Sequence, residues 1–496
     1  MATVPLVYLV IRTVGGALDD GGDAVRQTLT RPGTTELLVT SAALTAAVTV
    51  TCLALGVASA WLLVRTDVPM RGSLLVLSAL PLAVPSYVAA FGWIATVPGW
   101  SGFLPAWLVL SAVSTPYVTL PVVAALRSAD PALEEVARSL GSSPWRAWRT
   151  GTLPQVAPAA AAGALLAALY TLSDFGAVAM LRLPVFTYAI SRQYSSFVGR
   201  EVAVVLALVL VVGALLLVGL ERAVRGRGER WRTGSGARRL AAPVRLGRAT
   251  IPAVLLLLLA PAAAAAVPAV ALGRRLLAGT GRRLDLGDLT SAVISTAAVA
   301  SAGALLTSVL ALAIGILTAR HRGALVAGIE AAGFTGHALP GLVVALSLVF
   351  MSLNVVPGLY QTTTLLMLAY AVLFLPKAIG ATRTSIAQVP PVLAQTARSL
   401  GRGPVAAQAA TTWRLAGPGI GAGSLLVMLT AMKELPATLL LRPTGLDTLA
   451  TEIWSRTNSA AFGAAAPYAV ALVLLAAVPA FLLTRPQAWG ESGGSR

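Results

Sequence analysis

Charged residues are scarce in this chain. Only 11% of its 496 residues are charged and 57% are hydrophobic, whereas about a quarter of a typical soluble domain is charged. The single cysteine, Cys52, lies inside an apolar run, so an intrachain disulfide is excluded. The sequence has no phosphate-binding loop of the form G-x-x-x-x-G-K-[ST], so the chain is not itself an ATPase of that class. This composition indicates an integral membrane protein.

The hydrophobic residues form runs that predict membrane-spanning helices. A helix needs roughly 20 apolar residues to cross the hydrocarbon core, and the alternating pattern of a membrane β-barrel is absent. A short run precedes Arg12, and the predicted spans of the first half follow near residues 38–64, 73–97, 104–126, 157–181 and 201–220. Those of the second half are near 250–272, 289–318, 324–352, 361–382, 417–441 and 463–484. We therefore expect an all-α membrane protein with about 12 transmembrane helices.

An internal repeat divides the chain. Adding 260 to a residue number in the first half leads to its counterpart in the second, so Arg-Ser-Leu-Gly at 138–141 recurs at 398–401. The repeat centres on two polar loops, which we name loop 1 (residues 130–158) and loop 2 (residues 390–418). With six spans in each half, both halves have the same orientation, and the repeat is parallel.

The domain boundaries follow from the repeat and from a change in composition. We predict a first half at 1–220, with a short first helix, and a second half at 250–496. Between them, residues 221–249 are rich in Arg and Gly, which is typical of a flexible linker. If the linker and both loops face the cytoplasm, the chain obeys the positive-inside rule. The net charge of +18 then reflects membrane orientation rather than nucleic-acid binding.

Loop 1 has the residues of two short helices joined by a sharp turn. Asp130 is a favoured N-cap, and Gly141 can adopt the left-handed conformation that ends a helix. Ser143 caps the second helix and Pro144 suits its first position. We expect that helix to end at Pro154 and to be exposed to the cytoplasm.

Two tryptophans on the second helix of loop 1 indicate a binding surface. Trp145 and Trp148 lie on one side, beside Arg146 and Arg149. Aromatic anchors flanked by arginine are typical of a helix that docks into a groove of a partner. A helix that rests on lipid headgroups has a similar composition, so both interpretations stay open. The duplication favours docking, because a symmetric pair of loops suits a symmetric dimeric partner.

The spacing of residues in loop 1 resembles the EAA loop of permease subunits in ATP-binding-cassette importers, with the pattern E-A-A-x-x-x-G-x9-I-x-L-P. Loop 1 departs from it at Val136 and Gly151, and loop 2 departs further, with Gln395 at the glutamate position. In that family the loop seats a coupling helix in a cleft of the ATPase. The coupling residues that the resemblance implies are Glu135, Ala137, Arg138, Gly141, Pro144, Trp145, Trp148 and Pro154 in loop 1, and Ala397, Arg398, Gly401 and Pro404 in loop 2.

The resemblance extends beyond the loops. YTLSDFGAVAML follows loop 1 and MKELPATLLLRP follows loop 2, and two fused halves with these segments are similar to the ferric-iron importer permeases of the binding-protein-dependent class. The resemblance implies a non-enzymatic permease in the cytoplasmic membrane that binds no cofactor. It also implies a separate ATPase homodimer, which uses ATP on the cytoplasmic side, and an extracytoplasmic solute-binding protein. Thiamine, phosphonate or another oxyanion remains an alternative cargo, and an ion-coupled secondary transporter remains an alternative class.

Two carboxylates fall inside predicted spans at equivalent positions. Asp174 and Glu434 are 260 residues apart, each near the middle of the span that follows its loop. Intramembrane carboxylates are costly and usually face a cavity. We therefore expect both to face the translocation path. A structural hydrogen bond to a neighbouring helix is the alternative.

Overall fold

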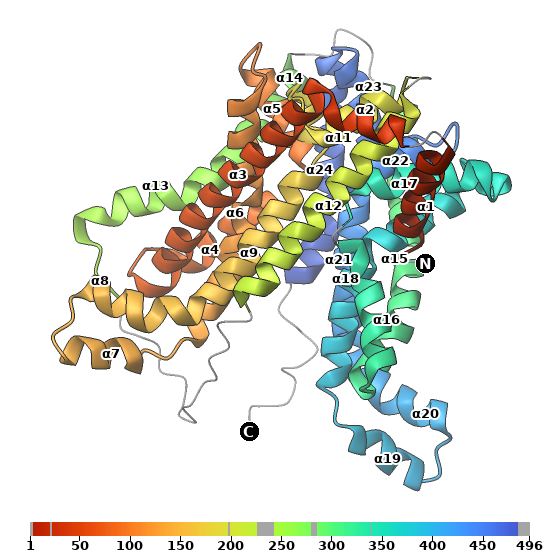
Figure 1. Cartoon of the computed structure of the whole chain (residues 1–496). Coiled ribbons are helices and arrows are strands. Elements are labelled where there is room, and N and C mark those ends of the chain that lie inside the picture. The colour runs from red at the N-terminus through yellow and green to blue at the C-terminus, as the bar shows by residue number, and fades with distance from the viewer. Residues whose placement is uncertain are drawn as a thin grey trace. The chain divides into compact units, whose positions relative to one another are not determined.

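The computed structural model describes residues 3–19, 22–196, 199–225, 243–278, 285–337 and 339–484. In these ranges the regular elements are helices (Figure 1). A single isolated bridge joins Thr66 to Val244 in the described chain. Nine of the described helices are long and apolar enough to cross a membrane, and a bent pair makes a tenth candidate. The predicted all-α membrane fold is confirmed.

The helices before the linker include long ones at the predicted hydrophobic runs and short ones between them. Their order is α1 (Val4–Asp19), α2 (Asp23–Thr30), α3 (Pro32–Arg65), α4 (Arg71–Ala79), η1 (Leu80–Ala83), α5 (Ser86–Thr96), α6 (Phe103–Ser128), α7 (Ala132–Ser139), α8 (Pro144–Ala147), η2 (Trp148–Thr152), α9 (Leu153–Ser173), α10 (Gly176–Met180), α11 (Phe186–Tyr194) and α12 (Arg200–Arg225).

The helices after the linker repeat this series. They are η3 (Gly247–Ala249), α13 (Thr250–Pro261), η4 (Ala262–Ala266), α14 (Val267–Leu277), α15 (Leu286–Arg320), α16 (Ala324–Phe334), η5 (Thr335–His337), α17 (Gly341–Asn354), η6 (Pro357–Leu359), α18 (Thr363–Ala387), α19 (Pro391–Ser399), α20 (Pro404–Gln408), η7 (Ala409–Trp413), α21 (Arg414–Met432), α22 (Pro436–Leu441), α23 (Leu449–Asn458) and α24 (Phe462–Thr484).

Four predicted spans are broken rather than continuous, and two of these breaks, within 157–181 and 417–441, are described with the site below. The span predicted near 73–97 consists of α4 with η1 and then α5, with a bend of 93° between the two parts. Its counterpart near 324–352 divides into α16 and α17. Pro85 and Pro340 are the N-caps of α5 and α17, and a proline there supplies no backbone N–H to continue the preceding helix.

The described chain forms two compact units, one of residues 23–277 and the other of residues 1–22 and 278–496. Within the first unit, α13 and α14 pack on α4, α5 and α6. Within the second, α1 packs on α17, and the Tyr8 hydroxyl donates to the Phe350 carbonyl at 3.1 Å. The first helical segment of each sequence half therefore packs in the unit that is built mostly from the other half.

Equivalent hydrogen bonds occur in the two units. The backbone N–H of Phe186, at the start of α11, donates to the Ser41 hydroxyl of α3 at 3.1 Å. The backbone N–H of Leu449, at the start of α23, donates to the Thr296 hydroxyl of α15 at 2.8 Å. In both units a hydroxyl on the longest helix thus fixes the start of the same short helix, as a structural repeat requires.

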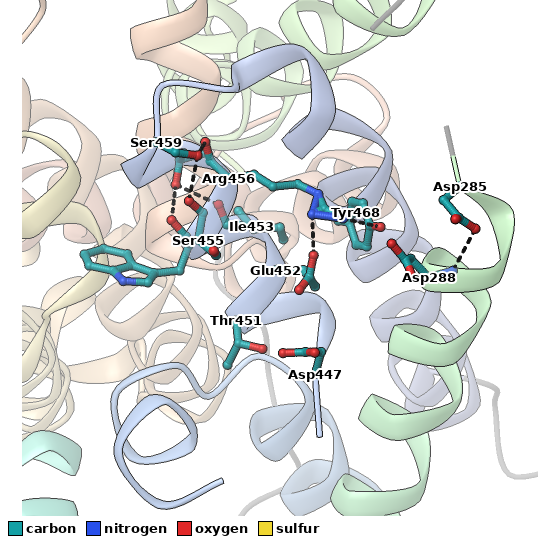
Figure 2. Close-up of polar contacts among 12 residues, drawn as sticks. Asp285, Asp288, Asp447, Thr451, Glu452, Ile453, Ser455, Arg456, Ser459 and Tyr468 are labelled. Carbon is teal, nitrogen blue, oxygen red and sulfur yellow. Dashed lines mark hydrogen bonds and ion pairs between the residues drawn. The ribbon is translucent and has the colours of Figure 1, made fainter. Parts of the chain in front are cut away.

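A polar cluster holds α23 against α24. Arg456 extends from α23 toward Tyr468 of α24, and Glu452 lies one turn before it (Figure 2). The guanidinium donates to the Tyr468 hydroxyl at 2.6 Å and also pairs with Glu452. At the start of α23, Thr448 and Thr451 form a reciprocal capping box. These contacts fix the position of the helix that follows Glu434 and α22.

Candidate coupling loops and membrane-interior carboxylates

The turn in loop 1 has the predicted geometry. The Asp130 carboxylate accepts the backbone N–H of Ala132, the first residue of α7, at 3.0 Å, although Pro131 rather than Asp130 is the N-cap residue. Gly141 has φ +82°, in the left-handed region, and its N–H donates to the Arg138 carbonyl at 3.0 Å. The N–H of Ser142 donates to the Ala137 carbonyl at 3.0 Å. A glycine is favoured here because a side chain strains this backbone conformation.

The second helix of loop 1 is longer than predicted. Ser143 caps α8 by accepting the N–H of Arg146 at 3.4 Å, and Pro144 lies in the first turn, as expected. The prediction that this helix ends at Pro154 is wrong, because α8 continues through the π-helical η2 into α9 as one helix of residues 144–173. A π-turn changes the hydrogen-bonding register, so the missing N–H of a proline at the start of α9 need not end the helix.

Loop 2 repeats this backbone with other side chains. Gly401 has φ +87°, and its N–H donates to the Arg398 carbonyl at 3.0 Å. Ala397 is buried, and Arg398 and Gln395 are exposed. Pro404 begins α20, which continues through the π-helical η7 into α21. The turn and the π-helical join are thus common to both loops, although most of the side chains differ.

Side chains of loop 1 that a partner could contact lie at its surface. Glu135, Arg138 and Trp145 are exposed, and the ring of Trp145 stacks on that of Trp148 with centroids 5.1 Å apart. Trp148 is half-buried and lines a cavity of about 1520 Å³ beside α3 and α9. Both rings line this cavity, and the ring of Trp145 is the more exposed of the two.

An ion pair that no sequence pattern predicted joins loop 1 to α3. Glu134, rather than Glu135, forms an ion pair with Arg65 at the end of α3 and accepts the Thr152 hydroxyl at 2.7 Å. The side chains of Arg65 and Glu134 are only 10% and 16% exposed. At the position equivalent to Glu134, loop 2 has the buried Ala394. This ion pair is therefore confined to loop 1.

Asp174 lies at a helix break rather than in the middle of a helix. It follows the last residue of α9, and its Oδ1 accepts the backbone N–H groups of Ala177 and Val178 at 3.0 and 3.3 Å. Ser86, at the start of α5, donates its hydroxyl to Oδ2. The carboxylate thus caps α10 and joins it to α5. This contact is the structural hydrogen bond to a neighbouring helix that was the alternative prediction for Asp174.

Glu434 occupies the equivalent break between α21 and α22. Its carboxylate accepts the backbone N–H of Ala437 at 2.9 Å and that of Thr438 at 3.0 Å. The residue opposite is Gly341, where an added Cβ would lie 3.1 Å from Oε1 of Glu434. In the first half the shorter Asp174 lies opposite Ser86, whereas in the second half the longer Glu434 lies opposite Gly341. A role of either carboxylate in the translocation path stays a prediction.

Duplicated broken spans and duplicated helix-turn-helix loops define a two-half membrane transport protein. Residues 34–227 match the family described as binding-protein-dependent transport system inner membrane component, and the chain belongs to this family of transport permeases. Over 491 residues it is 33% identical to an Fe(3+)-transport system permease protein of Haemophilus influenzae, covering 97% of this chain and 95% of the relative. The relative thus has the length of both halves.

Other relatives match a single half. A sulfate transport system permease protein of Synechocystis sp. is 31% identical over 192 residues, which cover 34% of this chain and 69% of the relative. A molybdenum transport system permease protein of Mycobacterium bovis is 32% identical over 216 residues, which cover 38% of this chain and 79% of the relative. The family fold is therefore shared by permeases with different cargoes.

Proposed function

We propose that this chain is the permease of an ATP-driven importer that moves ferric iron into the cytoplasm. The observation that carries the proposal is the similarity to an Fe(3+)-transport permease along nearly the full length of both chains. An extracytoplasmic binding protein delivers the cargo, and a cytoplasmic ATPase homodimer supplies the energy. The sequence of this chain lacks the phosphate-binding loop that ATP hydrolysis of this class requires.

In this proposal, loops 1 and 2 seat in the two ATPase subunits. Each loop places a short helix after a left-handed glycine turn, and each short helix continues into a membrane helix. A displacement of the short helix is therefore passed directly to α9 or α21, because no flexible joint separates them. Closure of the ATPase dimer then drives the exchange between inward-open and outward-open states. The loops, the linker and the C-terminus face the cytoplasm.

The cargo is tested by reconstitution. The permease is placed in proteoliposomes with a candidate ATPase and a candidate binding protein from the same genome. Uptake of radioactive ferric iron is then compared with that of sulfate, molybdate and thiamine. ATP-dependent uptake of iron above the others supports the proposal. Uptake of sulfate or molybdate instead would favour the second candidate, an oxyanion importer, to which the half-length relatives point. Uptake that persists with an inactive ATPase and follows an ion gradient would indicate a secondary transporter.

A further inference from the structure

A large cavity lies between loop 1 and the membrane helices of the unit formed by residues 23–277. Its volume is about 1520 Å³, whereas pockets for small molecules have about 300–1,000 Å³. Residues of α3, α9, α12 and α13 form its walls, and residues of loop 1 line one end. All four helices are candidate membrane spans or parts of them. Most of the cavity therefore lies at the depth of the bilayer.

The walls of this cavity are apolar, and small side chains make room for it. On α9 the residues that line it turn after turn are Ala157, Ala161, Ala164 and Ala168. On α3 it is lined by a stripe of mostly apolar residues that includes Val57. An apolar cavity takes up hydrocarbon rather than water, because a bound water needs polar partners. The cavity thus suits a ligand with long apolar chains.

The cavity has the length of one leaflet. Along α3 its lining extends from Thr49 to Arg65, a separation of 16 residues, which is about 24 Å in a helix. One leaflet with its headgroups is about 20–22 Å thick. The end at Thr49 therefore reaches the region of the bilayer midplane, and the end at Arg65 and loop 1 lies at the level of the headgroups.

The end at loop 1 carries polar and aromatic groups. Arg138 is exposed and lines this end, together with the stacked rings of Trp145 and Trp148. The indole N–H of Trp148 is buried and has no acceptor in the described part of the chain, and a buried donor without an acceptor is unfavourable. Tryptophan is enriched where a membrane meets water. A basic side chain, a donor and two aromatic rings therefore lie where a lipid headgroup would be.

Two carboxylates line the same end. Glu134 is paired with Arg65, and Glu135 precedes Arg138 by one helical turn. An end with both acidic and basic groups does not select for the net charge of a headgroup. The group that we expect to be recognised is the phosphate, which anionic and zwitterionic phospholipids share.

In the second half, the equivalent helix pair is filled by its own side chains. Ile420 takes the position of Ala160, which lines the cavity, and packs with residues of α15 in a core cluster. Ser424 takes the position of Ala164, and its hydroxyl lies 2.7 Å from that of Ser308 on α15. Close packing of this helix pair therefore does not require the alanines of α9.

The polar end also differs between the halves. Val405 and Gln408 take the positions of Trp145 and Trp148, whereas Arg398 keeps the arginine of Arg138. The second half thus has the same turn and the same arginine without the two indoles. It provides a comparison within one chain.

We propose that the cavity binds a phospholipid from the leaflet on the side of loop 1. Its acyl chains lie along α3 and α9, and its phosphate lies beside Arg138 and Trp148. A guanidinium group binds phosphate through paired N–H donors, and an indole N–H donates to an oxygen. Lipid tails are as apolar as the walls, so burial of the chains gives no preference over the surrounding lipid. The preference comes from the phosphate contacts and from the shape of the cavity.

This inference goes beyond the proposed import function, because lipid binding needs neither the cargo nor the ATPase nor the binding protein. A bound lipid would connect loop 1 with α3 and α9, close to the ion pair between Arg65 and Glu134. We therefore expect the lipid and the ion pair together to hold loop 1.

Photo-cross-linking tests the site on the full-length chain in lipid nanodiscs. The nanodiscs contain a trace of lipid with a diazirine in its acyl chain. The probes are phosphatidylglycerol, phosphatidylethanolamine and, as the lipid without phosphate, diacylglycerol with the same chains. Mass spectrometry gives the labelling of 157–168 in α9 and of the equivalent 417–428 in α21. The measured quantity is the ratio of phospholipid to diacylglycerol labelling, which cancels the different reactivities of the two stretches.

We expect this ratio to be about fivefold higher at 157–168 than at 417–428, which is the usual contribution of one arginine at a membrane surface. A higher ratio for both phospholipids supports recognition of the phosphate. A higher ratio for one of them also supports the site and identifies its headgroup. Equal ratios at the two stretches would overturn the proposal.

Substitutions at the two ends of the cavity provide a second test. Arg138→Gln should lower the ratio at 157–168 about fivefold. Arg398→Gln is the matched control and should leave it unchanged, because Arg398 is exposed at the equivalent position of loop 2. Ala161→Leu and Ala164→Leu enlarge half-buried side chains that line the cavity, so they should reduce labelling of 50–61 in α3. Labelling as in the wild type in Arg138→Gln and both leucine variants would reject the site.

A competition measurement keeps the test valid if a leucine variant does not fold. On the wild-type chain, an excess of either unlabelled phospholipid should reduce labelling of 157–168 more than the same excess of diacylglycerol. Equal competition would show that the cavity takes up hydrocarbon without recognising phosphate, against the proposal. Loss of the phospholipid preference with intact iron uptake rejects this site alone, whereas a clear preference without iron uptake supports the site and rejects the proposed cargo.

Discussion

Glu134→Gln should loosen loop 1 from the membrane helices without altering the turn itself. The substitution keeps the size of the side chain and removes its charge, so Arg65 loses its counter-ion at the end of α3. Thr152 keeps a side-chain oxygen to which its hydroxyl can donate. The turn at Gly141 depends on backbone hydrogen bonds, which the substitution does not touch. The expected result is a loop 1 that opens more often.

The size of the effect follows from the burial of the pair. An exposed ion pair contributes about 0–1 kcal/mol, and removing one partner of a buried pair costs about 3–5 kcal/mol. With side chains 10% and 16% exposed, the pair lies between these limits, and we estimate about 2–3 kcal/mol for local opening. A factor of ten corresponds to about 1.4 kcal/mol, so the opening equilibrium should shift about 25- to 150-fold.

Amide hydrogen exchange measures this opening directly. Peptides that cover 130–152 should exchange about 25- to 150-fold faster in Glu134→Gln, at conditions where closing is faster than chemical exchange and the rate follows the opening equilibrium. Peptides that cover 390–413 should be unchanged. Glu135→Gln is the matched control. It neutralises the adjacent carboxylate, which is exposed, and an exposed charge contributes less than about 1 kcal/mol.

Unchanged exchange in Glu134→Gln would show that the ion pair does not hold the loop. An equal increase in Glu134→Gln and Glu135→Gln would show that total charge, rather than the contact with Arg65, determines the opening. Faster exchange in both loops would indicate a general loss of stability. Each of these results would refute the argument from burial.

Three further substitutions test the shared turn and the two helix breaks. Gly141→Val should reduce co-purification of the ATPase more than Gln395→Ala does. A valine strains the backbone at φ +82°, whereas the exposed side chain of Gln395 can be removed at little cost. Equal losses would contradict this ranking. Asp174→Asn should lower both thermal stability and abundance, since the carboxylate caps α10, whereas lost uptake at normal abundance would favour a path role. Gly341→Ser should destabilise the protein through the contact with Glu434, and Glu434→Asp should restore part of the loss, as a thermal-unfolding double-mutant cycle can measure.

The features that were predicted correctly from the sequence are those that depend on neighbouring residues in the chain. Hydrophobic runs gave the positions of the membrane helices, because each run must be long enough to cross the hydrocarbon core. The left-handed glycine at 141 and the cap at Ser143 were predicted from residue preferences that depend on a few neighbouring backbone groups. The repeat extended the same predictions to loop 2.

Contacts between distant residues were not predictable in this way. Arg65 and Glu134 are 69 residues apart, and no periodic pattern relates them. The helix breaks at Asp174 and Glu434 lie within apolar runs, so hydropathy did not reveal them. The continuation of the helix past Pro154 depends on a π-turn, which can offset the missing proline N–H, whereas the residue preference alone indicated a helix end.

A comparison of loops 1 and 2 indicates which of their features the proposed coupling to an ATPase requires. Both loops have the left-handed glycine and the π-helical join, although loop 1 is held by an ion pair and loop 2 by buried alanines. Backbone features that persist while side chains diverge are those that fix the direction of the short helix relative to its membrane helix. The side-chain anchors then set how firmly each loop is held. An ATPase homodimer would therefore meet two loops of the same shape but different stiffness, and Glu134→Gln would reduce that difference.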